Sequence, residues 1–542
     1  MPANRNRLPL VLVWIVFALL WFGTLGCRDL IHPDEGRYAT LAQTMLHTGD
    51  WVTPRLNGIK YFEKPPLQYW ATAVGFKLFG ENNFAARLWP GITGFLTVLL
   101  IWFTGRRLWG EAAGNLAAIV LGSSLWWVGN GHFLTLDMGV SAFMTLTLCG
   151  FLLAQRDEAT RTEQRGWMMV VWLSMALALL SKGLISFVLP GAILVLYSCI
   201  SWHWRIWLRM HWLRGLVLFA LVGVPWFILV SLRNPEFARF FFIYEHFERF
   251  LSPSHNRTGV WWYFFPVLLV GLIPWVTLLP NALRQALPRH PGQLQPTWLL
   301  LIWSIFIFFF FSLSDSKLPS YILPIFPALA LLIGYAYRTA APQTLYWHAV
   351  FNAVLFAALA LGTHFYLVDP SDPVLSQYLV SWGRFGSLAF ALLALLAAWQ
   401  TWRGRALAAA LTLALASLLG GQIMMQGHQV FSREMSARQL VAAIRPDLTA
   451  DTPIYSIRSY DQTLPYYLHR NVTFVDYVDE FALGLKAEPW RSIPSLSAWE
   501  TLWRIQPRGI AILPKNQLPI LEAQHLPFTV IYQDDDRVAI KR

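Results

Sequence analysis

Long apolar runs separated by short charged segments make up most of the chain. One run, WLLLIWSIFIFFFFSL at residues 298–313, carries no charged side chain. The hydrocarbon core of a bilayer is about 30 Å thick and a helix needs roughly 20 apolar residues to cross it, so each run predicts a membrane-spanning helix. The pattern predicts about 13 spans, which begin near residues 8, 86, 112, 136, 167, 185, 213, 259, 297, 320, 344, 384 and 404.

The pattern changes after residue 427. TPIYSIRSYDQTLPYYLHRNVTFVDY alternates a strand-like run, a helical run and a second strand-like run, and GIAILP and FTVIYQDDDRVAIKR predict further strands. We therefore expect a polytopic α-helical membrane domain over residues 1–426. It includes the loop 27–85, with helices beside the membrane, and the loop 233–258. A soluble α/β domain over residues 427–542 follows it.

Basic residues cluster at every second junction between the predicted spans, from Arg7 near the start to Arg405 before the last span. The positive-inside rule makes these junctions cytoplasmic, which places the other loops and the C-terminal domain on the outer side. A composition of 56% hydrophobic and 13% charged residues fits a membrane protein. The net charge of +12 comes from the loop clusters, which argues against a nucleic-acid-binding face.

The first outer loop contains two helix signals and several charged residues. IHPDEGRYATLAQTML has Pro33 before its first acid, and PPLQYWATAVGFKLFG starts with two prolines directly after Glu63 and Lys64. Asp34 either offsets the dipole of the first helix or takes part in catalysis. Arg37 and Tyr38, three and four residues later, share its face of the helix.

Two charges stand alone among apolar residues. Asp137 is the only formal charge between Glu111 and Arg156, at the outer start of a predicted span. It is either a helix-start acid or a functional carboxylate. Lys182, in LALALLSKGLISFVLP, is either a lysine whose amine reaches the membrane surface or a ligand for an anion.

Two further outer segments carry candidate residues. FFFIYEHFERFLSPSHNR resembles an interfacial amphipathic helix, on which His246 and Arg249 lie three residues apart. A histidine needs a second partner to bind a metal, and Glu63 is a candidate for that partner. SDSKLPSYILP contributes Asp315, Lys317 and Tyr321, for which an ordinary loop remains the alternative.

Acids, bases and a histidine thus collect in the outer loops of a membrane protein. Cations suit a phosphate, acids suit a base or an amino group, and deep apolar surface suits a lipid tail. A transporter would more often place polar sites at the bilayer midplane and show internal repeats. We therefore expect an outward-facing enzyme that acts on an anionic, membrane-embedded substrate.

The stretch HPDEGRYATLAQTMLHTGDWVTPRLNGIKYFEKPPLQYW closely resembles the first periplasmic loop of bacterial lipid A aminoarabinose transferases. These are GT-C glycosyltransferases related to protein O-mannosyltransferases. The resemblance rests on the PDE-x-RY and YFEKPP motifs, with support from SKLPSYILP, and covers the multi-span region. It implies an inner-membrane enzyme with its active site toward the periplasm.

The resemblance implies a donor, undecaprenyl phosphate carrying 4-amino-4-deoxy-L-arabinose, and lipid A phosphate as acceptor, without nucleotide sugar or nucleic acid. Asp34 and Asp137 match the family's acidic residues. The residues similar to its donor-phosphate ligands are Lys64, Arg37, Lys182 and Arg249. Tyr38 and Tyr321 are expected in the sugar or acceptor pocket. Glu63 with His246 resembles a metal-binding pair, which implies a divalent metal such as zinc, and His255 is the alternative histidine.

The expected reaction is a single displacement with inversion at the anomeric carbon, giving resistance to polymyxin. Because the acceptor phosphate is already an anion, the main difficulty is to bring two anions together and to release undecaprenyl phosphate, which cations assist. Two alternatives remain open. One is a related transferase that uses another lipid-linked sugar, and the other is a lipid-linked sugar flippase.

Overall fold

The computed structural model describes residues 7–248, 259–287, 294–366, 373–427, 429 and 432–542. It divides into two compact units. The first comprises Met1–Leu25 and Arg87–Gly427, and the second comprises Gly26–Ala86 and His428–Arg542. The sequence-based membrane domain of residues 1–426 included the first outer loop. The compact units group this loop with the C-terminal segment instead.

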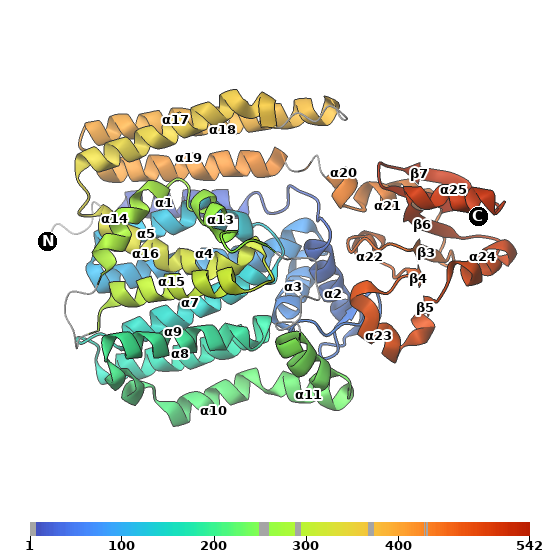
Figure 1. Ribbon diagram of the computed structural model, residues 1–542, viewed down its shortest axis with the longest axis horizontal. Helices are drawn as coiled ribbons and strands as arrows, with labels where there is room; N and C mark the ends of the chain where they lie inside the picture. The colour runs from blue at the N-terminus through green and yellow to red at the C-terminus, as the bar shows by residue number, and fades with distance from the viewer. Residues whose placement is uncertain (1–6, 249–258, 288–293, 367–372, 428, 430–431) are drawn as a thin grey trace. The chain divides into compact units, whose positions relative to one another are not determined.

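The first unit consists of helices (Figure 1), to which α4 contributes from Arg87 onward. Their bounds are α1 Arg7–Phe22, α4 Asn83–Trp109, α5 Glu111–Ser123, α6 Leu125–Gly131, α7 Leu136–Ala154, α8 Arg161–Lys182, α9 Ile185–Ser201, η1 Trp204–Arg209, α10 Trp212–Gly223, α11 Pro225–Arg233, η2 Arg239–Glu248, α13 Phe264–Gly271, η3 Val276–Leu278, α14 Leu279–Ala286, α15 Pro296–Leu313, η4 Pro319–Ile325, α16 Phe326–Tyr337, α17 Pro342–Tyr366, α18 Pro373–Trp402 and α19 Ala406–Gly427.

Many of these helices are long and apolar enough to cross a membrane, as the sequence predicted. Within the described residues, eight single helices qualify by length and composition, and the bent pairs α5–α6 and α13–α14 raise the number to ten. The helices α1 and α9 are apolar but shorter. The helix α8 begins with the charged segment RTEQR. A helix therefore lies near every predicted span, although fewer than the predicted number meet these criteria.

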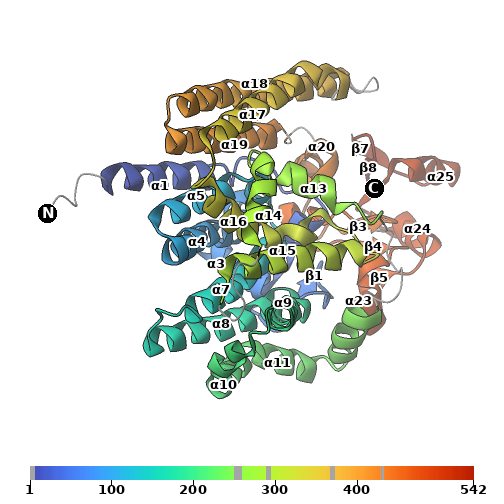
Figure 2. The same cartoon turned by 60° about the vertical axis from the view of Figure 1, so that its left-hand side comes forward.

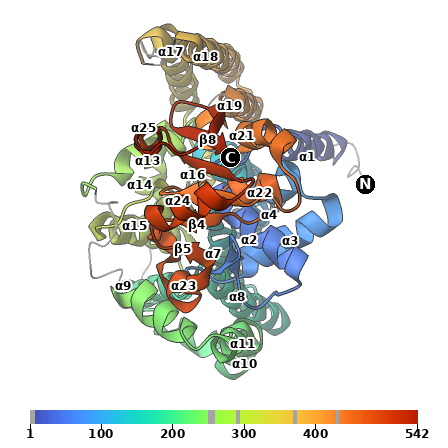
Figure 3. The ribbon, with the colours of Figure 1, turned by 90° about the vertical axis from the view of Figure 1, so that its right-hand side faces the viewer.

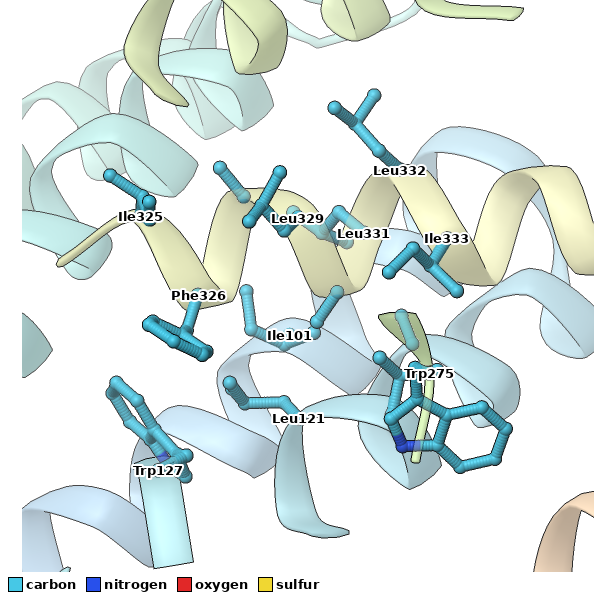
Figure 4. Close-up of a cluster of buried hydrophobic side chains, with 14 of the residues drawn as sticks. Ile101, Leu121, Trp127, Trp275, Ile325, Phe326, Leu329, Leu331, Leu332 and Ile333 are labelled. Carbon is cyan, nitrogen blue, oxygen red and sulfur yellow. The ribbon is translucent and has the colours of Figure 1, made fainter. Parts of the chain in front are cut away.

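The core of the first unit is packed with large apolar side chains from α4, α5, α6 and α16 (Figure 4). Three buried tryptophans satisfy their indole N–H groups inside it. Trp21 donates to the Gly91 carbonyl at 2.9 Å, and Trp275 donates to Ser123 Oγ at 3.0 Å. Because an unpaired polar group is costly in an apolar interior, these bonds fix the orientation of the rings. The third, Trp127, donates to the Gly94 carbonyl at 3.2 Å.

Helices that follow one another in sequence lie side by side. In Figure 2, α7, α8 and α9 are neighbours, as are α17, α18 and α19, and each of these sets is in mutual contact. The helices α5 and α16 approach very closely at Gly334. A Cβ atom at this glycine would lie 2.5 Å from the Ala117 nitrogen, so only glycine permits the approach.

The second unit contains a six-stranded mixed sheet in the order β5-β4-β3-β6-β8-β7. Its strands β4, β5 and β8 are labelled in Figure 3. The strands β5, β4, β3 and β6 run parallel to one another, whereas β8 pairs antiparallel with β6 and β7. The predicted strands around residues 454, 473, 510, 529 and 537 are confirmed. The bounds are β3 Ile454–Ile457, β4 Thr473–Val475, β5 Ser492–Ile493, β6 Ile510–Pro514, β7 Thr529–Gln533 and β8 Arg537–Lys541.

Short helices pack against this sheet. Trp499 and Trp503 of α24 pack with Tyr455 and Leu513 on one face. The helices of this part of the chain are α20 Ser432–Met435, α21 Arg438–Ile444, η6 Arg445–Asp447, α22 Leu464–Leu468, η7 Asp479–Phe481, α23 Ala482–Ala487, η8 Pro489–Arg491, α24 Leu496–Ile505, η9 Lys515–Gln517 and α25 Leu518–Ala523.

The first outer loop is bound to this sheet domain by many contacts. It forms α2 Asp34–Thr48, the hairpin β1 Arg55–Leu56 with β2 Ile59–Lys60, and α3 Leu67–Phe79. The side chain of Asn57 exchanges two hydrogen bonds with the Val472 backbone, at 2.7 and 2.8 Å. Arg55 pairs with Glu488 at 2.9 Å. These bonds join segments more than 400 positions apart, which a sequence-based domain boundary cannot anticipate.

Candidate active site

Asp34 and Arg37 form the centre of a polar cluster in the second unit. Asp34 lies in the first turn of α2, and Arg37 Nη1 donates to Asp34 Oδ1 at 2.6 Å. Arg37 Nε donates to Glu480 Oε2 at 2.8 Å. The Asp34 side chain is 49% exposed, whereas that of Glu480 is 9% exposed. Arg37 therefore joins an accessible carboxylate to a buried one.

Glu480 is itself held in place by the sheet domain. It lies on η7, and its Oε1 accepts from Gln462 Nε2 at 2.8 Å. Sequence reasoning did not identify Glu480 or Gln462 as candidates. The available signal was weak, namely the acids of YVDEF shortly after a predicted strand. Their proximity to Arg37 depends on the fold of the whole unit.

The close contact of α2 with the segment before α22 brings these groups together. A Cβ atom at Gly36 would lie 2.5 Å from the Gln462 carbonyl carbon and equally close to the Thr463 nitrogen. Thr40 Oγ1 donates to the Gln462 carbonyl at 3.1 Å. The glycine beside Arg37 thus allows the helix to pack directly on the backbone that carries Gln462.

Two buried tyrosines connect Arg37 with the YFEKPP motif. Burial is the main cause that raises the pKa of Tyr61 and Tyr69, and the Glu63 carboxylate raises it further. The positive charge of Arg37 acts in the opposite direction and lowers the pKa of both phenols. Both phenols therefore stay protonated at neutral pH. Tyr38 stacks on Tyr69, with ring centroids 6.0 Å apart. Asp34, Arg37, Tyr38 and Glu63 consequently share one environment.

Lys64 lies directly before the two prolines that precede α3, close to the predicted helix start. Its Nζ donates to the Glu63 carbonyl oxygen at 2.9 Å, and both side chains are half-buried. The chain between Lys64 and α3 is short because the helix begins at Leu67 with Pro66 as its N-cap. This hydrogen bond holds the amine against the backbone shortly before α3.

A second polar cluster lies in the first unit. Asp137 is in the first turn of α7, and Lys182 is the last residue of α8. Lys182 Nζ donates to Asp137 Oδ1 in an ion pair, and it lies 5.1 Å from the centroid of the Tyr321 ring on η4. An acid at a helix start and a base at a helix end each interact favourably with the helix dipoles. The structure thus joins three of the predicted residues, and Lys182 is an ion-paired side chain.

Lys317, from the same outer segment as Tyr321, stabilises the end of a helix. Its Nζ donates to the carbonyl oxygens of Ser312 at 2.8 Å and Ser314 at 2.6 Å, and more weakly to that of Phe311. These are the unsatisfied carbonyls at the end of α15. The buried amine therefore caps the helix.

The remaining candidates of the 233–258 loop are not described. Arg249 and His255 lie outside the described residues, and so does the side chain of His246, whose backbone belongs to η2. Among the side chains that the structure does describe, no group of three or more His, Cys, Asp or Glu residues could hold a metal ion. The described residues therefore do not by themselves fit the expected zinc, and the Glu63–His246 pair stays a prediction.

Known protein families match segments of both units. A sequence model described as the dolichyl-phosphate-mannose-protein mannosyltransferase family matches residues 7–241, and one described as the aminoarabinose transferase C-terminal domain matches residues 440–542. The undecaprenyl phosphate-α-4-amino-4-deoxy-L-arabinose arabinosyl transferase of Erwinia tasmaniensis is 33% identical over 76% of this chain and 75% of its own length. The chain belongs to the aminoarabinose transferase family.

Other family members agree with this assignment. The enzyme of the same description from Pseudomonas paraeruginosa is 36% identical, over 66% of this chain and 65% of its own length. That alignment therefore spans slightly less than two thirds of the relative. The crystal structure of ArnT from Cupriavidus metallidurans bound to undecaprenyl phosphate has a TM-score of 0.93 at 34% identity, and covers 98% of this chain and 97% of that chain. The predicted GT-C fold is thereby confirmed.

In this aminoarabinose transferase homologue, the two matched segments contain different residues of the polar clusters. Residues 7–241 include Arg37 and the Asp137–Lys182 pair, whereas residues 440–542 include Glu480. The Arg37–Glu480 ion pair thus joins the segment shared with mannosyltransferases to the C-terminal domain described for aminoarabinose transferases.

Proposed function

We propose that the protein is a glycosyltransferase that moves 4-amino-4-deoxy-L-arabinose from undecaprenyl phosphate to phosphate groups of lipid A. The match to ArnT bound to undecaprenyl phosphate, over 98% of this chain, is the observation that supports this most directly. We place the reaction at the periplasmic face of the bacterial inner membrane, where the modification gives resistance to polymyxin and other cationic peptides.

In the proposed reaction an oxygen of the lipid A phosphate attacks the anomeric carbon. The bond from that carbon to undecaprenyl phosphate breaks, and its electron pair leaves with the phosphate, so the anomeric configuration inverts. Both phosphates are anions in the ground state and the leaving phosphate gains charge in the transition state. Fixed cations near the leaving oxygen therefore supply the largest assistance.

The two clusters suggest different roles for the basic residues. Lys64, held close to the start of α3, is the proposed principal ligand of the leaving phosphate. Arg37 and Lys182 already pair with carboxylates, so they hold Asp34 and Asp137 in position as well as adding positive potential. Arg249 completes the proposed phosphate ligands on the basis of the family resemblance.

The acids suit the amino group of the sugar. The Asp34 side chain is half exposed and therefore reachable by substrate, whereas that of Asp137 is 15% exposed and paired with Lys182. A carboxylate that accepts from an ammonium group forms a charge-assisted hydrogen bond, which is stronger than one between neutral groups. Tyr38 and Tyr321 are the proposed aromatic walls of the sugar or acceptor pocket.

The test is mass spectrometry of lipid A from a strain in which the gene is deleted and then restored. We expect the mass of one aminoarabinose per modified phosphate to disappear on deletion and to return with the wild-type gene. Restoration with Lys64→Ala should not return it, although the protein is present in the membrane at normal level. Lipid A that is unchanged by the deletion would overturn the proposed acceptor and favour a related transferase or a flippase.

A further inference from the structure

The chain from the end of α9 to the start of α10 carries a group of arginines that the proposed reaction does not use. This segment, WHWRIWLRMHWLR at residues 202–214, includes the short helix η1. We name Arg205, Arg209 and Arg214 the arginine cluster. The 17 residues of α9 separate the segment from Lys182 by about 25 Å of helix at 1.5 Å per residue. The positive-inside rule predicts that this junction is cytoplasmic, on the side opposite to the outer loops.

The arginine cluster is cationic without a counter-charge from the protein. All three side chains are exposed, and none of them forms an ion pair, a hydrogen bond or a ring contact with the residues that the structure describes. The sequence contains no acid between Glu163 and Glu236. Arg214 lies in the first turn of α10, where the helix dipole disfavours a cation, so the stability of this helix does not explain it. The cluster therefore offers its charge to a ligand from outside the chain.

Large apolar side chains accompany the arginine cluster. The exposed fraction is 83% for Trp202, 86% for Leu208 and 81% for Leu213, and we name these three residues the apolar rim. Each leucine of the rim directly precedes an arginine of the cluster. Tryptophan and arginine together are typical of the boundary between a bilayer and water. A free anion would contact the arginines alone, whereas a lipid with an anionic headgroup would contact both the cluster and the rim.

The backbone that carries the cluster is held by contacts with α8 and within the segment. Ile206 and Met210 are buried, and Trp172 Nε1 of α8 donates to the Met210 carbonyl at 2.8 Å. Trp207 and Trp212 stack with ring centroids 6.0 Å apart, and Trp212 Nε1 donates to the Trp207 carbonyl at 3.0 Å. The helices α8 and α10 lie side by side (Figure 2). Because the backbone is already ordered, less conformational entropy is lost when a ligand binds.

We propose that the arginine cluster binds the headgroup of an anionic phospholipid in the cytoplasmic leaflet, with the apolar rim against its acyl chains. Guanidinium groups bind phosphate through paired hydrogen bonds. Basic residues beside a membrane span attract anionic lipids through their charge. The cluster supplies the complementary charge, and the rim selects a lipid over a free phosphate. The proposal does not depend on the proposed transferase reaction.

The experiment titrates the full chain in detergent with dioleoylphosphatidylglycerol and measures bound lipid by native mass spectrometry. Dioleoylphosphatidylcholine, which has the same acyl chains and no net charge, is the comparison and should bind more weakly. Combining Arg205→Gln, Arg209→Gln and Arg214→Gln should weaken binding of the first phosphatidylglycerol about a hundredfold, since each arginine near anionic lipid contributes about fivefold. Phosphatidylcholine binding should not change. Arg209→Gln alone should weaken phosphatidylglycerol binding about fivefold, which tests the proposal even if the triple variant unfolds.

A matched control locates the binding. Arg161→Gln, Arg165→Gln and Arg405→Gln together remove the same charge from exposed positions at other predicted cytoplasmic junctions, and should leave phosphatidylglycerol binding unchanged. Equal weakening by this control would reduce the effect to general surface charge and overturn the site. Phosphatidylcholine that binds as tightly as phosphatidylglycerol, or wild-type affinity in the variants of the arginine cluster, would also overturn it. Displacement of phosphatidylglycerol by an equal concentration of inorganic phosphate would overturn the lipid as the ligand.

Discussion

Arg37 Nε donates at 2.8 Å to Oε2 of Glu480, a residue 443 positions later in the chain. The same guanidinium donates to Asp34 at 2.6 Å. The C-terminal domain therefore supplies one of the two carboxylates that hold Arg37, and it takes part in building the candidate active site.

Replacing Glu480 with glutamine should reduce transfer without removing the protein from the membrane. The variant loses one charge-assisted bond to Arg37, a contribution of about 1.5–3 kcal/mol, or roughly tenfold to a hundredfold in rate if all of it acts on the transition state. In-vitro transfer from the lipid-linked sugar should show the loss mainly in kcat/KM. Glu522→Gln, an exposed acid of the same domain, serves as the control. Equal activity of the two variants would remove Glu480 from the site.

The stability of the protein should depend on pH through Glu480. Burial is the main cause that raises the pKa of this carboxyl, and Arg37 counteracts it. The folded protein thus binds the proton more tightly than the unfolded chain does. Its contribution to stability is present below the unfolded pKa and is lost as pH rises through the folded pKa. Glu480→Gln should therefore show a flatter dependence of Tm on pH in the acidic range than wild type, and an identical curve would contradict the assignment.

Asp137 and Lys182 should behave as one unit in a double-mutant cycle. Asp137→Asn or Lys182→Gln alone leaves a poorly solvated charge, because the side chains are only 15% and 20% exposed. The double variant removes both charges, so its loss of stability should be smaller than the sum of the single losses by about 0.5–3 kcal/mol. Thermal unfolding in detergent measures the three values. Strict additivity would show that the pair contributes nothing.

Gly36→Ala should loosen α2 from the segment that carries Gln462. The new Cβ atom would lie 2.5 Å from backbone atoms, and overpacking of this kind costs about 1–3 kcal/mol. Limited proteolysis should cut the first outer loop faster in this variant. Gly166→Ala is the matched control, since this glycine lies in α8 and a Cβ atom added there would have no other atom within 4 Å. Equal protease resistance of both variants would contradict the close packing.

Lys317→Met should act on stability and leave the intrinsic activity of the folded protein unchanged. The substitution leaves the carbonyl oxygens at the end of α15 without their shared donor, at a cost of about 1–3 kcal/mol. A lower Tm with normal transfer per folded molecule is expected, with Lys486→Met as the exposed control. A full loss of transfer at unchanged Tm would assign Lys317 to the substrate site instead.

The sequence by itself determined the apolar helices, the strands after residue 427 and the family. Membrane helices are recognisable because the bilayer demands long continuous apolar runs, and prolines such as Pro66 mark helix starts through local geometry. The motif around Asp34 and Lys64 was recognisable because its residues are contiguous. These features depend on neighbours in the chain, so no knowledge of the fold was needed.

Only the tertiary structure decided which charges meet. Lys182 could have reached the membrane surface alone, yet it pairs with Asp137 from another helix. Lys317 was a candidate residue of an outer loop, with an ordinary loop residue as the alternative, yet it caps α15. Glu480 carried almost no local signal, because its role arises from a contact across 443 positions. Such pairings are set by how whole helices and strands pack against one another. A single sequence contains no direct measure of this packing.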